Sequence, residues 1–173
     1  MADFGLAWYA SDKSTPIAFE GDFKMYLSMS GITGYGGAKL RGDIQAFLDA
    51  ITDAAVRDRI AACPRICYDA LNRRFDDLRD RIWMPRQFEV YGPGEGDGVA
   101  NAEYAVSNRF PVFTSNYSRK AYAATDLTRG VYWTLASQSA HDTTRFRMVG
   151  AAGSSVYGGA NVAYAIRPCY TIA

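Results

Sequence analysis

Residues that most often carry catalysis or bind metals are scarce in this sequence. Its 173 residues include one histidine, His141, and three cysteines, Cys63, Cys67 and Cys169. An odd number of cysteines gives no even disulfide framework, and no second cysteine pair or nearby histidine completes a zinc site. The motifs G-x-S-x-G and G-x-x-x-x-G-K-S/T are absent, which argues against a nucleophile turn and a phosphate loop. We therefore expect no catalytic residue, no metal site and no cofactor.

Two local patterns resemble parts of known sites without completing them. His141 stands beside Asp142, but adjacent loop residues rarely point together as a Ser-His-Asp arrangement requires. Side chains with oxygen atoms that suit calcium gather in one glycine-rich stretch, at Glu95, Asp97, Asn101 and Glu103. Their spacing matches no EF-hand. We interpret His141 as a surface residue and the acidic stretch as a loop.

The chain also lacks an excess of charge of one sign and a long apolar run. Nineteen lysines and arginines stand against eighteen aspartates and glutamates, for a formal net charge of +1, which leaves no electrostatic footprint for nucleic acid. No apolar stretch approaches the roughly 20 residues that span a bilayer, and residues 1–12 lack a basic region followed by an apolar run. We expect synthesis in a cytosol without a signal peptide, and neither nucleic acid nor a membrane as partner.

Glycine and tyrosine, by contrast, are abundant. The chain has 16 glycines and 12 tyrosines, with 49% hydrophobic and 21% charged residues. The overall usage is typical of one globular domain. Many turns and many rigid, amphipathic tyrosine side chains suit a loop-rich binding domain.

Hydrophobic periodicity predicts helices first and strands afterwards. After a short strand over 23–29, apolar residues at helical spacing predict a helix that starts at an N-cap, Asp43, and stops at Pro64. A second helix is predicted over 69–81, with charged outer faces and four inward residues, Leu71, Phe75, Leu78 and Ile82. Pro85 opens a further helical turn. Short antiparallel strands are predicted over 110–114, 131–136, 145–149, 154–157 and 161–172, so the fold class is α+β.

Four later segments, taken in order, resemble the DUF6273 family. Residues 82–92, Ile-Trp-Met-Pro-Arg-Gln-Phe-Glu-Val-Tyr-Gly, resemble its W-L-P-S-x-x-E-V-F-G segment. Residues 131–137 are similar to its tyrosine and tryptophan strand, 146–150 to its F-x-x-V-x-x-x-G hairpin, and 165–172 to its closing G-V-R-P-A-F-x-I. With a similar helix upstream, the resemblance covers 40–173 as one domain. It leaves 1–39 as an N-terminal strand and glycine-rich segment, a candidate for docking.

The same order of motifs is similar to C-type-lectin-like and formylglycine-generating-enzyme-like domains. The resemblance implies a C-type-lectin-like fold, in which an N-terminal helical half packs beside short antiparallel strands and the late strands form the ligand surface. Seven motif positions are expected to hold the scaffold together: Trp83, Pro85, Glu89, Tyr132, Trp133, Arg167 and Pro168. Their aromatic rings are expected in the core with Phe88. Glu89 is expected to orient backbone, and Arg167 to tie the last strand to a carboxylate or carbonyl.

Alternation in the late strands predicts where a ligand binds. If Phe146 and Met148 face the core, Arg145 and Arg147 point outward, as does Tyr157 on the next strand. With the polar loop 138–144, these positions form one expected ligand-binding surface: Gln138, His141, Asp142, Arg145, Arg147, Tyr157 and Asn161. Tyrosine among small polar residues is the chemistry of antibody-like paratopes. Ordinary polar hairpin edges are the alternative interpretation.

The resemblance also implies a biological setting, because DUF6273 domains are frequent in phages and prophages of gut bacteria. We expect a non-catalytic binding domain of a virion, at a tail fibre tip or in an accessory protein, that recognises a bacterial surface glycan or protein. The alternative is a capsid or baseplate decoration protein that contacts other virion proteins. A formylglycine-generating enzyme would need copper and paired cysteines, which the three cysteines do not resemble. A homo-oligomer, such as a trimer, stays open, although no heptad stretch is present.

Overall fold

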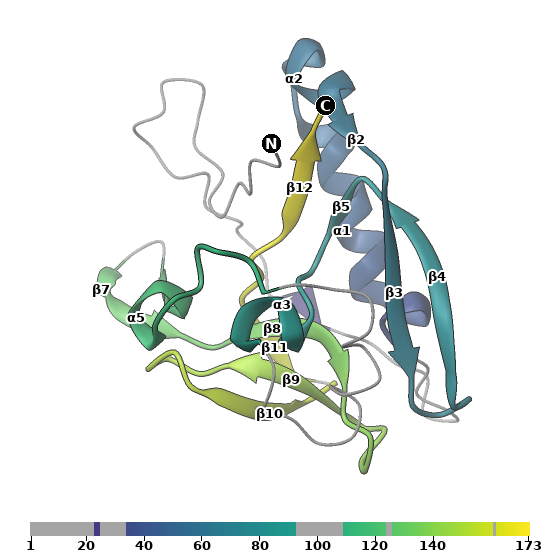
Figure 1. Ribbon diagram of the computed structural model, residues 1–173. Coiled ribbons are helices and arrows are strands. Elements are labelled where there is room, and N and C mark those ends of the chain that lie inside the picture. The colour runs from purple at the N-terminus through teal and green to yellow at the C-terminus, as the bar shows by residue number, and fades with distance from the viewer. Residues whose placement is uncertain (1–22, 25–33, 93–108, 124–125, 161) are drawn as a thin grey trace.

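The computed structural model describes residues 23–24, 34–92, 109–123, 126–160 and 162–173 (Figure 1). It contains a few short helices and several small antiparallel sheets, so the α+β class is confirmed. The helical elements are η1 (Tyr35–Gly37), α1 (Lys39–Ala50), α2 (Ala54–Arg59), α3 (Gln87–Tyr91) and α5 (Asn116–Arg119). Among these, no helix is long and apolar enough to cross a membrane.

The strands are short and pair into small sheets. They are β1 (Phe23–Lys24), β2 (Ile60–Ala61), β3 (Cys63–Asp69), β4 (Arg74–Asp80), β5 (Ile82–Trp83), β6 (Ala121–Ala123), β7 (Asp126–Val131), β8 (Trp133–Gln138), β9 (Arg145–Val149), β10 (Ser155–Gly159), β11 (Ala163–Tyr164) and β12 (Cys169–Ile172). β9 lies between β8 and β10, and β12 joins β2 to β5. The remaining pairs are β3 with β4, β6 with β7, and β1 with β11. Through β1, the segment before residue 40 contributes a strand.

The first predicted helix is two helices in the structure. α1 begins at Lys39, before the predicted start at Asp43, and buries an apolar stripe made of Leu40, Ile44 and Leu48. The helix ends at Ala50, and Asp53 starts α2 as an N-cap whose carboxylate accepts hydrogen bonds from the next backbone N–H groups. An N-cap aspartate competes with continued helix for these donors, which explains why one predicted helix breaks in two.

The second predicted helix, over 69–81, is wrong: its residues form part of the β3–β4 hairpin. The Asp69 carboxylate accepts hydrogen bonds from the backbone N–H groups of Leu71 and Asn72 and so closes the turn. Arg73 adopts a left-handed φ of 52° there. Leu71 and Phe75, expected inward, are 42% and 47% exposed. The sequence pattern failed because β4 buries a charged residue, Asp80, which a hydrophobic stripe cannot indicate.

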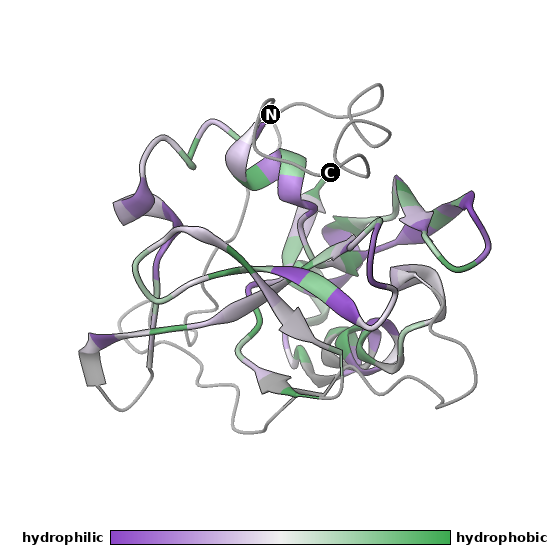
Figure 2. Ribbon diagram, turned by 90° about the horizontal axis from the view of Figure 1, so that it is seen from below, coloured by the Kyte–Doolittle hydropathy of each residue, from purple (hydrophilic) through white to green (hydrophobic). Residues whose placement is uncertain are grey.

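The late strands are closer to expectation. β9 matches its predicted bounds, and β10 begins one residue later than predicted and continues to Gly159. Phe146 and Met148 are buried as predicted. Figure 2 shows hydrophilic and hydrophobic residues alternating along strands in this way. The strand predicted over 110–114 is instead a turn, with Phe110 and Phe113 both buried.

The motif segment 82–92 links two of the sheets, through β5 to β12 and through Pro85 and α3 to β8. β5 pairs with β12, which places Trp83 opposite Cys169. α3 follows and adjoins β8, because the Ala136 N–H donates to the Pro85 carbonyl and the Gln87 N–H donates to the Ser137 hydroxyl. In Figure 1, α3 lies close to β8, while α1 and the β3–β4 hairpin run alongside one another at the other end.

Candidate functional site

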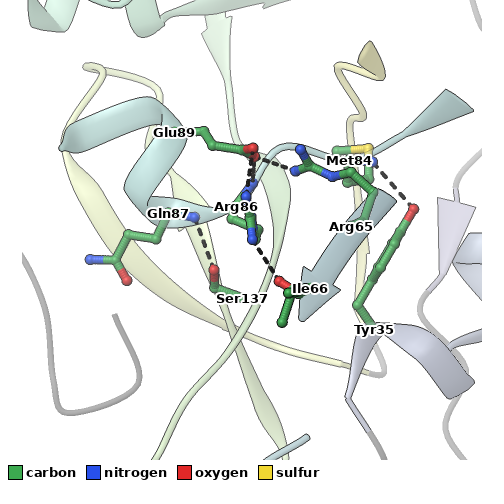
Figure 3. Close-up of polar contacts among 8 residues, drawn as sticks. All are labelled: Tyr35, Arg65, Ile66, Met84, Arg86, Gln87, Glu89 and Ser137. Carbon is green, nitrogen blue, oxygen red and sulfur yellow. Dashed lines mark hydrogen bonds and ion pairs between the residues drawn. The ribbon is translucent and has the colours of Figure 1, made fainter. Parts of the chain in front are cut away.

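A buried carboxylate with two arginine partners joins β3 to α3 (Figure 3). Glu89, on α3, accepts hydrogen bonds from the side chain of Arg65 on β3 and from the Arg86 guanidinium at 2.9 Å. Its other oxygen also accepts the Arg86 backbone N–H at 2.8 Å. Arg86 reaches back to the Ile66 carbonyl at 2.6 Å. The network therefore ties β3 to the start of α3, and the expectation that Glu89 orients backbone is met.

Electrostatics keep this network ionised despite its burial. Burial alone raises the pKa of the Glu89 carboxyl, but the charges and hydrogen bonds of Arg65 and Arg86 outweigh it, so that the pKa is lowered. Burial alone lowers the pKa of Arg65, and Glu89 reverses that shift. A buried ion pair of this kind is strongly destabilised when one partner is removed, because the other charge is left without compensation. Its role is to position the scaffold.

The last motif arginine has a similar structural role beside α5. The Nη1 atom of Arg167 donates hydrogen bonds to the carbonyls of Arg119 and Lys120, each at 3.1 Å. Its guanidinium lies over the rings of Phe113 and Trp133, at 5.3 and 5.2 Å from their centroids. The expected bond to a carbonyl is therefore present. Burial lowers the pKa of Arg167, and the carbonyls and aromatic faces supply the compensation that a carboxylate would otherwise give.

Not every expected core aromatic is in the core. Trp83, Trp133 and Phe88 are buried, as predicted. Tyr132 is 51% exposed, so its prediction as a core residue is wrong. Trp133 Nε1 donates to the Arg119 carbonyl at 2.9 Å, which turns this ring inward. Neighbouring residues of an extended chain point to opposite sides, so Tyr132 points outward.

The β9–β10 hairpin carries the polar surface expected for a ligand. Arg147 and Tyr157 are directly opposite in the antiparallel register, and the guanidinium lies 3.8 Å from the centroid of the tyrosine ring. Arg147 also donates to the Ser155 hydroxyl at 3.3 Å. Arg145, two residues away on β9, shares the same face. The structure therefore brings three of the predicted residues together.

The loop before β9 adds a carboxylate to this surface. Asp142 pairs with Arg145 at 3.1 Å and accepts hydrogen bonds from the backbone and hydroxyl of Thr144. The Thr144 hydrogen bonds are the main reason that the pKa of Asp142 is lowered, with a smaller contribution from Arg145. His141 is exposed, and its backbone N–H donates to the Ser139 hydroxyl. Asp142 is thus an ionised group held by its own loop.

Two predicted ligand residues are not part of this surface as described. Gln138 is wholly buried: its side chain accepts from the Ala70 N–H at 2.9 Å and donates to the Thr143 carbonyl at 2.7 Å. The expectation that it lies on an exposed loop is wrong, because β8 extends as far as this residue. Its amide instead joins the turn after β3 to the loop before β9. Asn161 lies outside the described residues.

The turn between β9 and β10 is fixed against the rest of the domain. Tyr91 donates from its hydroxyl to the Gly153 carbonyl at 3.1 Å. Gly153 has a φ of +87° and packs directly against the backbone of Asn116, where an added Cβ would collide. This contact holds one end of the hairpin, so that the polar face of β9–β10 has a rigid support.

The cysteines form no arrangement that suggests catalysis. All three are free thiols. Cys63 donates to the Thr171 hydroxyl at 3.2 Å. Burial raises the pKa of Cys169 to about 12, which disfavours the thiolate that acts as nucleophile or metal ligand.

In the part of the chain that the structure describes, no group of three or more His, Cys, Asp or Glu residues is placed to hold a metal ion. The acidic stretch considered for calcium, Glu95 to Glu103, lies outside the described residues.

Sequence reasoning missed the two arginines of the buried network. Arg86 stands where the resembled segment has serine, and Arg65 comes just after Pro64, the predicted stop of the first helix. The proximity of Arg65 to Glu89 depends on the β3–β4 hairpin, since 24 residues separate them in the chain. The only signal available was the presence of a glutamate three residues after Arg86, in a segment rich in large apolar residues.

Comparison with known proteins identifies the family of the chain but supplies no characterised relative. No curated protein and no solved structure matches it. A family model described as a domain of unknown function, DUF6273, matches residues 20–173, and so begins before the resemblance seen from residue 40. The chain belongs to the DUF6273 family.

Proposed function

We propose that this chain is a non-catalytic binding domain of a phage virion, which recognises a bacterial surface glycan or protein through β9–β10 and the loop before β9. The observation that carries the proposal is the polar face of the hairpin, where Arg145, Arg147 and Tyr157 lie together. Guanidinium groups, a tyrosine ring and the Asp142 carboxylate offer charge-assisted hydrogen bonds and a flat surface for stacking.

The rigidity of the hairpin supports this proposal. Phe146 and Met148 bury the opposite face, and Tyr91 with Gly153 fixes the turn. The other end is closed by backbone hydrogen bonds from Ser139 to Arg145 and from Ala160 to Thr144, each 2.9 Å long. A surface that is ordered before binding loses less conformational entropy when it captures a ligand.

The scaffold on this proposal is C-type-lectin-like. The order of the motifs supports it, together with the burial of Trp83 and Trp133 and the backbone hydrogen bond from Ala136 on β8 to Pro85. The placement in a virion rests on the resemblance to a family that is frequent in phages. Fold and family alone do not determine a ligand, so the proposal stands on the chemistry of the hairpin face.

The test is direct binding of the purified chain to a panel of gut-bacterial cells and their isolated surface glycans. Tyr157→Ala and Arg145→Ala should each weaken binding about tenfold or more, as central contacts of an interface do. Tyr117→Ala is the matched control, because Tyr117 is 75% exposed on α5, which adjoins the turn of the hairpin, and is not a residue of its polar face. Equal weakening by all three variants would contradict the assignment of the surface.

Absence of binding by the folded chain to every cell and glycan would remove the receptor proposal. Electron microscopy of assembled particles would then distinguish the decoration protein. In that case, the face of β9–β10 should be covered by a neighbouring virion subunit.

A further inference from the structure

The β3–β4 hairpin leaves one strand edge open. Among the described residues, β4 pairs only with β3. Figure 1 shows β4 on the outer side of the hairpin, with β3 between it and β12. An unpaired edge presents backbone N–H and C=O groups that can accept a strand from another chain. The side chains of β4 determine which strand fits this edge.

Positive and negative charges alternate in blocks along β4 and the turn before it. Arg73, Arg74 and Arg79 are exposed, and so is Asp77. Asp76 is less exposed and pairs with Arg74 at 3.1 Å. This mixture favours neither an acidic nor a basic partner strand. It favours a strand that carries the same charges in reverse order, so that arginine meets aspartate in both directions.

A second copy of β4 meets this requirement in an antiparallel register centred on Phe75. In a two-fold antiparallel pair, one residue lies opposite its own copy and the residues on either side pair crosswise. With Phe75 at the centre, Arg74 lies opposite Asp76 of the second copy. Arg73, which directly precedes β4, lies opposite Asp77. Both pairs join opposite charges, and each occurs twice by symmetry.

Other registers centred on a residue of β4 put like charges opposite each other. A register centred on any charged residue of the strand pairs that residue with its own copy. A register centred on Leu78 pairs Asp76 with Asp80. Like charges directly opposite across a sheet are destabilising. The charges of β4 therefore select the register centred on Phe75.

The centre of this register carries an exposed aromatic side chain. Phe75 is 47% exposed, and its ring lies 5.3 Å from that of Tyr68, which is opposite on β3. Two copies paired at Phe75 bring two phenylalanine rings together, with a tyrosine beside each. Aromatic pairs across neighbouring strands stabilise a sheet, and their contact removes apolar surface from water.

We propose that the open edge of β4 pairs with β4 of a second copy of this chain, in the antiparallel register centred on Phe75. The two hairpins then form one four-stranded sheet in the order β3–β4–β4–β3. Backbone hydrogen bonds along the shared edge supply affinity, and the crosswise arginine–aspartate pairs fix the register. This surface is distinct from the β9–β10 face, and its pairing does not depend on receptor recognition.

The test compares the mass of the full chain with that of charge variants by analytical ultracentrifugation over a dilution series. The wild type is expected to dimerise reversibly. Arg73→Asp puts two carboxylates opposite each other and Asp77→Arg puts two guanidinium groups there, so each variant should weaken the dimer about tenfold or more. Both positions are exposed, and circular dichroism checks that each variant folds. A wild type that stays monomeric at every concentration would overturn the proposal.

A mixture of the two variants separates this register from any other contact. In a mixed dimer, positions 73 and 77 of the Arg73→Asp chain carry aspartate and face arginine at positions 77 and 73 of the Asp77→Arg chain. The mixture should therefore associate at least as tightly as the wild type, although each variant alone is weakened. A mixture that associates no better than its components would overturn the proposal.

Asp58→Arg is the matched control, because it makes the same change of charge at a 75% exposed side chain on α2. It should dimerise as the wild type does. Weakening equal to that of Asp77→Arg would show that the effect follows net charge rather than the β4 edge, and would overturn the proposal.

Hydrogen exchange of the wild type tests strand pairing without any substitution. At concentrations where the dimer forms, alternate amides of residues 73–77 should exchange more slowly than in the diluted chain, because their N–H groups face the shared edge. A dimer whose formation leaves all of these amides unprotected would overturn the proposal.

Discussion

The two long hairpins, β3–β4 and β9–β10, are held to the domain in different ways. β3–β4 is anchored by buried charge: Arg65 pairs with Glu89, and Asp80 pairs with Arg41 at 2.7 Å. β9–β10 is anchored by close packing: Phe146 and Met148 are buried, and Gly153 fits tightly against the backbone of Asn116. A hairpin rich in charged residues can therefore pack into the domain when each buried charge has a partner of opposite sign.

The same difference separates the outer surfaces of the two hairpins. β9–β10 buries one face and keeps its polar groups on the other, which suits recognition by side chains. β4 directs charge both inward and outward.

The largest effect is expected where the anchoring charge is removed. Glu89→Gln leaves Arg65 and Arg86 buried without a carboxylate, and should lower the free energy of unfolding by about 3–5 kcal/mol. Urea denaturation followed by circular dichroism measures the change. Asp58→Asn, at an exposed site on α2, should have no measurable effect. A similar small change for both variants would show that the network does not anchor β3.

The same network predicts sensitivity to acid. The pKa of Glu89 is lowered from an ordinary value of 4.5, so its ionised form is favoured by folding. Its stabilisation is complete above that ordinary value and is lost as the pH falls below it toward the lower pKa of the folded state. Unfolding measured across this range should show a loss of stability in the wild type that is smaller in Glu89→Gln. Parallel curves for the two proteins would contradict the assignment.

Because close packing anchors β9–β10, a substitution at its turn should have a large effect on the stability of the fold. Gly153→Ala adds a Cβ that collides with Asn116 at a left-handed φ, and should destabilise the fold by about 2–4 kcal/mol. Thermal unfolding gives the comparison with Gly42→Ala. Gly42 lies in α1 with open space around it, so that variant should stabilise by about 0.5–1 kcal/mol. Tolerance of alanine at both positions would refute the close fit.

A smaller effect is expected at the tip of β3–β4. Asp69→Ala removes the acceptor for the N–H groups of Leu71 and Asn72, with an expected loss of about 1–2 kcal/mol. Hydrogen exchange should accelerate near residues 69–74 and stay unchanged in β9–β10. Acceleration in both hairpins would mean that they unfold as one unit.

The smallest effect on stability is expected at the exposed pair of Asp142 and Arg145. Arg145→Ala removes an ion pair in which the Arg145 side chain is 58% exposed and that of Asp142 is 42% exposed. Water screens the attraction in such exposed pairs. The melting temperature should therefore stay unchanged, while binding to the receptor weakens as proposed. A marked drop in melting temperature would assign this pair to the scaffold.

Much of the α+β arrangement was accessible from the sequence. The apolar stripe of α1 and the alternation of β9 each carry their own periodicity, and the tryptophan–proline segment indicated the family that the chain belongs to. The helix predicted over 69–81 was wrong because its apolar residues follow helical spacing, whereas the strand that forms there buries Asp80. The candidate surface was predicted in part: Arg145, Arg147 and Tyr157 lie on one face, whereas Gln138 is buried.

The sequence by itself determined those features that depend on local patterns of apolar residues, such as the inward positions of Phe146 and Met148. Only the tertiary structure decided which charges are buried and with what partners. Arg65 meets Glu89, and Arg41 meets Asp80, across 24 and 39 residues of chain. The physical reason is that burial of a charge is favourable only when a partner from elsewhere compensates it, and that partner is absent from any local window of sequence.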